Sequence, residues 1–283
     1  MTSAVHVAPA ARPASPPAGR GAPGFARLLL SEWTKIRSVR STVWSLLVLV
    51  VVSVGFTALF AALAVANWNG LRAAPRDARI LADPVSSVLG TGIGLGQLAI
   101  CVLGALVMTT EYSTGVIRAS LLAVPRRIPM LAAKAVIFAA LILVVGEIVT
   151  FGSFFVGSSI LHSHVHLSLG QPGVARAVIG TGLSLTVLGL FAMAIGALIR
   201  HTAGAIATVI GVVLVLPILS GLLPGSWGAH INAYLPEQAG GLISQAHQQA
   251  GNLLSPWQGF GVFCIWTALL LAAAAYLLRW RDA

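Results

Sequence analysis

Six long apolar stretches dominate the sequence and leave few choices of fold. Each stretch has about 20 or more mostly hydrophobic residues, which is the length a helix needs to cross the hydrocarbon core of a bilayer. Only 8% of the residues are charged and 57% are hydrophobic, whereas soluble domains carry about 25% charged residues. The sequence predicts a one-domain, all-α integral membrane protein. Its transmembrane helices are expected at 43–65, 86–108, 129–154, 177–199, 203–223 and 259–278.

The positive charges predict the orientation of these spans. Six spans place both termini on one side, and with the N-terminus in the cytoplasm 13 of the 17 lysines and arginines fall in inner segments. That bias follows the positive-inside rule, and attraction to anionic lipid accounts for the net charge of +10. Nucleic-acid binding is not predicted, because it would require an aromatic platform or a folded basic module. Fifteen arginines against two lysines indicate a GC-rich genome and thus a bacterial plasma membrane.

The chain before the first span divides into two parts. Residues 1–24 are rich in alanine and proline and are expected to form a disordered cytoplasmic tail. Residues 25–39 gather apolar side chains on one face, which predicts an interfacial helix that also carries Glu32, Lys35 and Arg37. Glu32 falls inside the apolar stripe, where a bare carboxylate is costly. It is expected to pair with Lys35 or with an arginine of the inner hinge, unless it reaches water from the interface.

Two further features lie in or beside the spans. Glu147 stands within the third span, where an intramembrane acid predicts a proton relay or a substrate contact. The alternative is a carboxyl near the outer interface that is hydrogen-bonded to a neighbouring helix, such as the one that bears Ser184 or Thr186. The second span carries Gly90, Gly92, Gly94 and Gly96, which form two small-xxx-small pairs suited to close helix contact.

The outer segments hold two more candidates. His162, His164 and His166 could hold zinc or copper, but no cysteine or acidic residue stands nearby to complete a site, so a solvated loop is the main expectation. Residues 224–258 repeat apolar side chains at helical spacing from Leu235 to Leu254, with Pro236 suited to a first turn. This pattern predicts an amphipathic or re-entrant helix on the outer face.

The inner connection between the second and third spans is unusually polar. A turn at Gly115 separates its acidic beginning from an amphipathic run and an arginine-rich end, an order that matches a helix macrodipole. Such a helix could transmit a push from a soluble partner, although the positive-inside rule alone would also account for its arginines. The residues of interest in this hinge are Glu111, Tyr112, Gly115, Arg118, Pro125, Arg126 and Arg127.

Motifs for ATP or zinc chemistry do not occur in the chain. The two lysines follow Thr34 and Ala133, so neither belongs to a Walker A loop, and no glutamate belongs to an H-E-x-x-H pattern. No G-x-S-x-G elbow is present either. The sequence therefore predicts a protein that is not an enzyme, has no cofactor of its own and cannot bind ATP through a Walker A loop.

Together these motifs resemble a known family. Glu32, Lys35, Arg37 and Ser38 in an interfacial helix, six spans, and the hinge with Glu111-Tyr-Ser-Thr-Gly115 and Pro125-Arg-Arg127 are similar to the permease subunits of type-2 ATP-binding-cassette (ABC) transporters, especially actinobacterial members. The resemblance covers the chain from Phe25 onward.

The resemblance implies a non-catalytic subunit that dimerises, with an identical or a different permease, and binds cytoplasmic ATPase subunits carrying ATP and Mg²⁺. The segment from Glu111 to Arg127 would be the coupling helix, with residues 25–39 as the connecting helix beside it. Substrate, more often exported than imported, would pass along a dimer seam lined mainly by the second and fifth spans. The alternative is an ATP-independent secondary transporter or membrane sensor that uses Glu147 and the outer histidines. The lining residues leave the substrate open.

Overall fold

The structure is a computed structural model that describes residues 24–38, 40–68, 83–115, 127–223, 226–249 and 251–280. These ranges contain helices and no strand, which confirms the all-α prediction. The elements are α1 (Phe25–Ser38), α2 (Arg40–Ala66), α5 (Pro84–Ser113), α7 (Arg127–Leu161), α8 (Val174–Ile199), α9 (Thr202–Ile210), the π-helix η2 (Gly211–Val215), α10 (Leu216–Gly221), α11 (Ser226–Ala233), α12 (Pro236–Gly241), the 3-10 helix η3 (Leu242–Ser244) and α13 (Pro256–Trp280).

Six helical segments of the described chain are long and apolar enough to cross a membrane, as the sequence predicts. Four are the helices α5, α7, α8 and α13, the first is most of α2, and the fifth is assembled from α9, η2 and α10. The third span runs beyond its predicted end at residue 154 and reaches Leu161. Its last polar residues do not break the helix, because the hydroxyls of Ser158 and Ser159 donate to carbonyls of the preceding turn.

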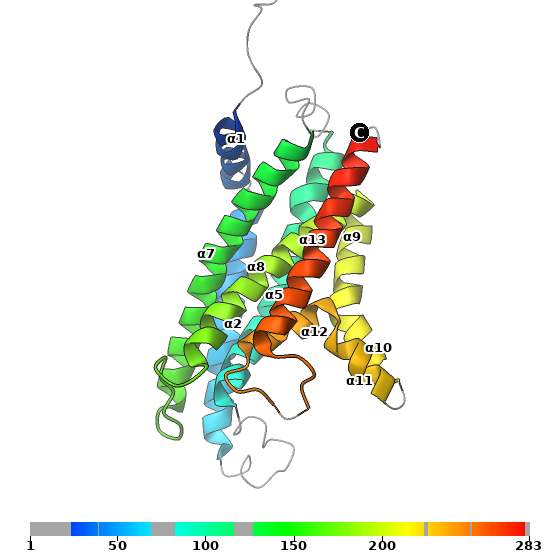
Figure 1. The fold of residues 1–283 in the computed structure, drawn as a ribbon. Coiled ribbons are helices and arrows are strands. Elements are labelled where there is room, and N and C mark those ends of the chain that lie inside the picture. The colour runs from blue at the N-terminus through cyan, green and yellow to red at the C-terminus, as the bar shows by residue number, and fades with distance from the viewer. Residues whose placement is uncertain are drawn as a thin grey trace, which may run out of the picture.

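Helix α8 forms the centre of the bundle, between α5, α7 and α13 (Figure 1). Two-thirds of its apolar window is buried (67%), against 22% for the first span. Close packing with α5 depends on glycine: a Cβ on Gly104 would lie 2.6 Å from the carbonyl oxygen of Gly189, and one on Gly196 would lie 2.8 Å from that of Ala105. Small residues at both contacts let the two backbones approach.

The glycines of the second span serve two different surfaces. Gly92 and Gly96 pack against Ser53 and Thr57 of α2, where a Cβ would overlap side-chain oxygens, so this pair has the predicted role in helix contact. Gly90 and Gly94 open onto a groove instead, and a Cβ added at either position would meet nothing within 4 Å.

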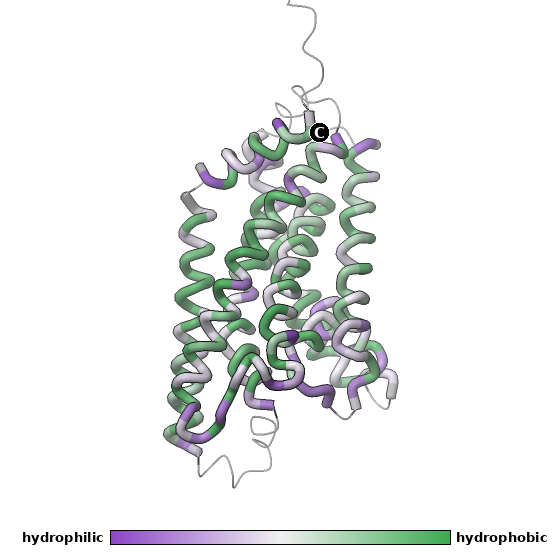
Figure 2. The backbone as a smooth tube through the Cα atoms, turned by 60° about the vertical axis from the view of Figure 1, so that its left-hand side comes forward, coloured by the Kyte–Doolittle hydropathy of each residue, from purple (hydrophilic) through white to green (hydrophobic). Residues whose placement is uncertain are grey.

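The helices run between two polar ends (Figure 2). One end holds α1, the last turn of α5, the first turn of α7 and the last turn of α13, and is called the terminal end below (Figure 1). The guanidinium of Arg127 donates to the carbonyl of Leu278 at 2.6 Å and joins α7 to α13 there. The opposite end, called the distal end, holds α11, α12 and the loop after α7 (Figure 1).

The fifth span is irregular at its centre. Its helix widens to a π turn over Gly211–Val215, and Pro217 follows in the first turn of α10. Proline has no N–H to donate to the preceding turn, and a widened turn is one way in which a helix accommodates it. The π turn brings Val213 and Leu214 to the wall of the groove described below.

The predicted outer helix is present but shorter than expected. Two short helices, α11 and α12, turn back toward the bundle, and η3 ends the helical part at Ser244 rather than near Leu254. The physical reason lies in the next residues: the N–H groups of Ala246 and His247 bond to the carboxylate of Asp83 instead of continuing the helical ladder. Residues 245–249 and 251–254 are therefore not helical, although the apolar spacing continues to Leu254.

Candidate functional site: a charge cluster and a polar groove

Helix α1 lies against the bundle through a face that is apolar except for one acid. Leu28 and Ile36 are buried on this face, while Phe25, Leu30 and Trp33 are exposed. Glu32 stands between the two buried residues and is only 2% exposed. The sequence places Glu32 in this stripe because a helix repeats every 3.6 residues, and the structure confirms that position.

Two lysines satisfy the buried carboxylate of Glu32. Its Oε1 lies 2.6 Å from Nζ of Lys35, the i+3 partner expected from the sequence. Its Oε2 lies 2.6 Å from Nζ of Lys134 in the second turn of α7. The second cation is thus Lys134 of the third span, to which no sequence pattern pointed.

Glu111, in the last turn of α5, completes the cluster. Its Oε1 lies 2.7 Å from Nζ of Lys134 and 3.5 Å from Nζ of Lys35. The four side chains, which we call the charge cluster, therefore join α1, α5 and α7 through two acids and two bases, with no net charge. The side chains of Glu32 and Lys134 are each 3% exposed and that of Glu111 is 11% exposed, whereas that of Lys35 is 37% exposed.

The electrostatics of the cluster favour the ionised forms. Burial acts to raise the pKa of Glu32, but the charges and hydrogen bonds of Lys134 and Lys35 outweigh it and hold that pKa below the ordinary value of 4.5. Burial acts to lower the pKa of Lys35, and the bond to Glu32 with the charges of Glu111 and Glu32 raises that pKa above 10.5 instead. Both groups are therefore charged at neutral pH.

The hinge begins directly at this cluster. Glu111 and Tyr112 belong to the last turn of α5 rather than to a separate helix, and Oε2 of Glu111 has no hydrogen-bond partner within the described ranges. Arg200, the residue after α8, lies over the Tyr112 ring at 5.0 Å. The predicted turn at Gly115 is confirmed, since this residue has a φ of 71° and donates to the carbonyl of Tyr112.

Other hinge residues of the prediction fall in different places. Arg118, Pro125 and Arg126 lie outside the described residues, as do all of residues 116–126, which make up most of the segment from Glu111 to Arg127 that the resemblance would make a coupling helix. Arg127 is the first residue of α7 and binds the end of α13. Arg37, in the last turn of α1, is exposed.

A polar groove lies at the distal side of the bundle. A cavity of about 520 Å³ is bounded by α5, α8, the irregular fifth span and α12, and a second of about 430 Å³ lies between α11, α12 and the following loop. The two cavities share four residues, and together we call them the groove. The shared residues are Glu237, Gln238, Gly241 and Gln245.

Glu237, in the first turn of α12, is an acid of the groove to which no sequence pattern pointed. The amide of Gln238 donates to its Oε2 at 3.0 Å. Burial raises the pKa of Glu237, and a hydrogen bond with Gln97 of α5 offsets part of that rise. Gln97 lies about 20 Å along α5 from Pro84, at roughly 1.5 Å per residue. The re-entrant helix α12 therefore carries a carboxyl deep into the bundle.

Two long-range contacts hold α12 in this position. The carboxylate of Asp83 caps α5 through the N–H of Ser86 and also accepts from Ala246 at 3.1 Å and His247 at 3.5 Å. Arg176, near the start of α8, donates to the carbonyls of Gln245 and Ala246 at 2.8 and 2.9 Å. The loop after η3 is thus bonded at both its N–H and its C=O groups, and we call this pair of contacts the clamp.

Glu147 has a different environment from the one that the sequence favours. Its carboxyl occupies the space that a Cβ on Gly182 of α8 would fill, and Oε2 has no hydrogen-bond partner among the described residues. Ser184 donates to Gly240 and Thr186 donates to Gly182, so neither binds Glu147 as expected. Glu147 thus lies against α8, the helix that bears Ser184 and Thr186, without a bond to either hydroxyl.

The three outer histidines do not converge. The rings of His162 and His166 pack edge to face at 5.0 Å, whereas that of His164 lies 4.6 Å from Trp68 and its Nδ1 pairs with the Ser163 hydroxyl. Among the described residues, no group of three or more histidine, cysteine or acidic side chains could hold a metal ion.

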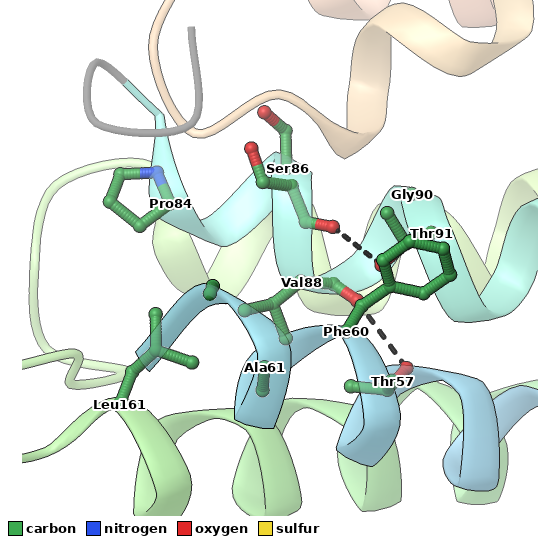
Figure 3. Close-up of a pocket in the computed structure, with 11 residues that line it drawn as sticks. Thr57, Phe60, Ala61, Pro84, Ser86, Val88, Gly90, Thr91 and Leu161 are labelled. Atoms are coloured by element: carbon green, nitrogen blue, oxygen red, sulfur yellow. Dashed lines mark hydrogen bonds between the residues drawn. The ribbon is translucent and has the colours of Figure 1, made fainter. Parts of the chain in front are cut away.

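A small apolar pocket of about 240 Å³ lies between α2, α5 and the end of α7 (Figure 3). The hydroxyls that reach it are occupied: Thr91 donates to Ser87 and Thr57 donates to Val88, both through backbone carbonyls. The walls of this pocket are mainly aliphatic, so it could bind an apolar group through hydrophobic contact.

No protein-family model matches the chain, and no curated protein matches it. The resemblance to ABC permeases therefore depends on the sequence motifs alone.

Proposed function

We propose that the chain is the membrane-spanning subunit of an ABC exporter, driven by a separate cytoplasmic ATPase. The observation that carries this proposal is the charge cluster, which ties α1 to the two helix ends that flank the hinge. A force applied to the hinge would reach α5 and α7 directly, and α1 through Lys134. This route is supported by the contact of Glu111, at the start of the proposed coupling segment, with Lys35 of the proposed connecting helix.

A subunit of this kind has an ATPase at its terminal end and a second permease along the membrane. The second and fifth spans leave a groove between them, where the resemblance puts the seam of a permease dimer. With the terminal end in the cytoplasm of a bacterial plasma membrane, the hinge faces the ATPase and the groove lies toward the outer side.

The first test is purification of the tagged chain in mild detergent from its own membranes. The proposal expects a protein with a Walker A loop to co-purify in a fixed ratio, and vesicles that contain both proteins to export a substrate only with ATP. Recovery of the chain alone from several mild detergents, together with flux that needs no ATP, would contradict the proposal.

The second test concerns the hinge. Arg118→Glu is expected to uncouple ATP hydrolysis from transport. Arg279→Glu makes the same charge change on an exposed side chain of the terminal end and is the control. Glu111 is a poor site for charge reversal, because a third cation in the buried cluster would destabilise the fold. Undiminished coupled transport in Arg118→Glu would remove the hinge from the mechanism.

The alternative of an ATP-independent carrier or membrane sensor depends on the outer histidines and on Glu147, whose Oε2 has no hydrogen-bond partner among the described residues. It predicts proton-dependent flux in vesicles without any ATPase, and loss of this flux in Glu147→Gln. ATP-dependent flux that persists in this variant favours the exporter.

A further inference from the structure

The acid in the groove and the two acids of the charge cluster have different surroundings. Glu32 and Glu111 each contact a lysine within 2.7 Å. Glu237 receives hydrogen bonds from Gln238 and Gln97 but lines a groove whose other described wall residues are all uncharged. An ionised carboxylate in such surroundings is stabilised by a cation. A cationic ligand would supply the counter-charge that the described chain does not provide.

The walls of the groove suit a particular kind of cation. Beside Glu237 stand amides and hydroxyls, while the opposite wall on the second and fifth spans is aliphatic. A volume of about 520 Å³ falls within the usual range for sites of small organic molecules. The aliphatic wall residues are Leu89, Ile93, Val213, Leu214 and Ile218. A ligand with an apolar body and one positive charge would match both sides.

The backbone around the groove leaves space for such a ligand. Gly90 and Gly94 of α5 face it without side chains, and a Cβ added to either would meet nothing within 4 Å. The π turn on the fifth span shapes the facing wall, and interruptions of this type are frequent at functional sites. The clamp holds α12, so Glu237 keeps its place in a groove whose other described wall residues are uncharged.

We propose that the groove is a binding site for monovalent organic cations with an apolar body, in which Glu237 is the counter-ion and Gln97 and Gln238 orient its carboxylate. Calling these cations the transported substrates depends on the proposed function. Binding itself requires no ATPase, so its outcome is independent of whether a partner is found.

The test measures equilibrium binding of two probes to the purified chain in detergent. Tetraphenylphosphonium is the cation, and tetraphenylborate is an anion of nearly the same size and shape. The proposal expects saturable binding of the cation alone. Glu237→Gln should weaken it by at least about tenfold, a difference one charged contact commonly supplies. Asp282→Asn, which removes a carboxylate near the C-terminus, is the control and should bind as wild type does.

A second variant covers the case in which Glu237→Gln does not fold. Gly94→Leu fills the groove from α5 and should also abolish binding, whereas Gly55→Leu introduces the same side chain on α2, where the space is likewise open. Thermal unfolding of each variant confirms that it is folded. Equal binding of both probes by the wild type, or undiminished cation binding by folded Glu237→Gln, would overturn the proposal.

Discussion

Nζ of Lys134 lies 2.6 Å from Oε2 of Glu32, across 102 residues of chain and with each side chain 3% exposed. Removing one partner of a buried ion pair costs about 3–5 kcal/mol, because the remaining charge stays buried without compensation. This contact thus makes the position of α1 depend on the second turn of α7.

Lys134→Met should strongly destabilise the protein. Among the described residues, the variant leaves Glu32 and Glu111 with the partly exposed Lys35 as their remaining cation, and we expect the free energy of unfolding to fall by about 3–5 kcal/mol. Denaturant unfolding in detergent micelles measures the loss. Arg279→Met, at an exposed position of the same end, is the control.

The double variant Glu32→Gln, Lys134→Met should be more stable than Lys134→Met alone, since it removes a carboxylate that has lost its partner. A double-mutant cycle gives the coupling between the two residues. Additive effects of the two single changes would show that the pair has no energetic link.

The free energy of unfolding should be highest and nearly constant around neutral pH, and should fall at both acidic and alkaline pH. Glu32 has a lowered pKa, so its contribution is full above its ordinary value of 4.5 and is lost as the pH falls through the folded-state pKa. Lys35 has a raised pKa, so its contribution is full below 10.5 and is lost as the pH rises through the folded-state pKa. Thermal unfolding between pH 3 and about 11 follows both limbs.

Glu32→Gln should flatten the acid limb of this profile, because the carboxyl with the lowered pKa is removed.

Glu237 is the opposite case: burial raises its pKa, so its ionisation destabilises the fold as the pH rises above 4.5. Glu237→Gln should therefore gain stability relative to the wild type at neutral pH and not at pH 4. An acid limb unchanged in Glu32→Gln would remove that residue from the pH dependence.

The sequence predicts the spans well, because each is a continuous apolar run that only a helix can carry across a bilayer. It also identifies Glu32 as a residue that requires a partner, since helical periodicity alone puts this acid in an apolar stripe. It does not identify Lys134 as that partner. This lysine belongs to an apolar run, and whether it reaches α1 depends on how α7 packs.

Glu237 was missed for a related reason. In the sequence it follows a proline in an outer segment, where an acid is expected to meet water. Its half-buried position results from the packing of α12 against the bundle, where Asp83 contacts Ala246 across 163 residues of chain, and no local pattern reveals such a contact. Likewise, the end of the outer helix at Ser244 is set by Asp83 and Arg176 and not by the continuing apolar spacing.

Gly104→Ala should separate α5 from α8. The added methyl would lie 2.6 Å from the carbonyl oxygen of Gly189 and 2.7 Å from Cβ of Ala192, so backbone must move at a cost of about 1–3 kcal/mol. Gly94→Ala makes the same substitution on the same helix, where nothing lies within 4 Å, and should leave unfolding within about 1 kcal/mol of the wild type. Equal effects of both changes in denaturant unfolding would contradict the packing described for α8.

Asp83→Asn should release the loop after η3 while α5 keeps its cap. The amide oxygen of asparagine can still accept from Ser86, but its NH₂ group would face the N–H groups of Ala246 and His247, which then lose their acceptor. A buried N–H without a partner costs about 1–3 kcal/mol. Hydrogen exchange followed by mass spectrometry should therefore show faster exchange at 245–249 and little change at the start of α5. Ser87→Ala, which removes only a local hydroxyl bond to the Asp83 carbonyl, is the matched control. Faster exchange throughout α5 would mean that Asp83 acts mainly as a helix cap, and unchanged exchange in the loop would exclude it from the clamp.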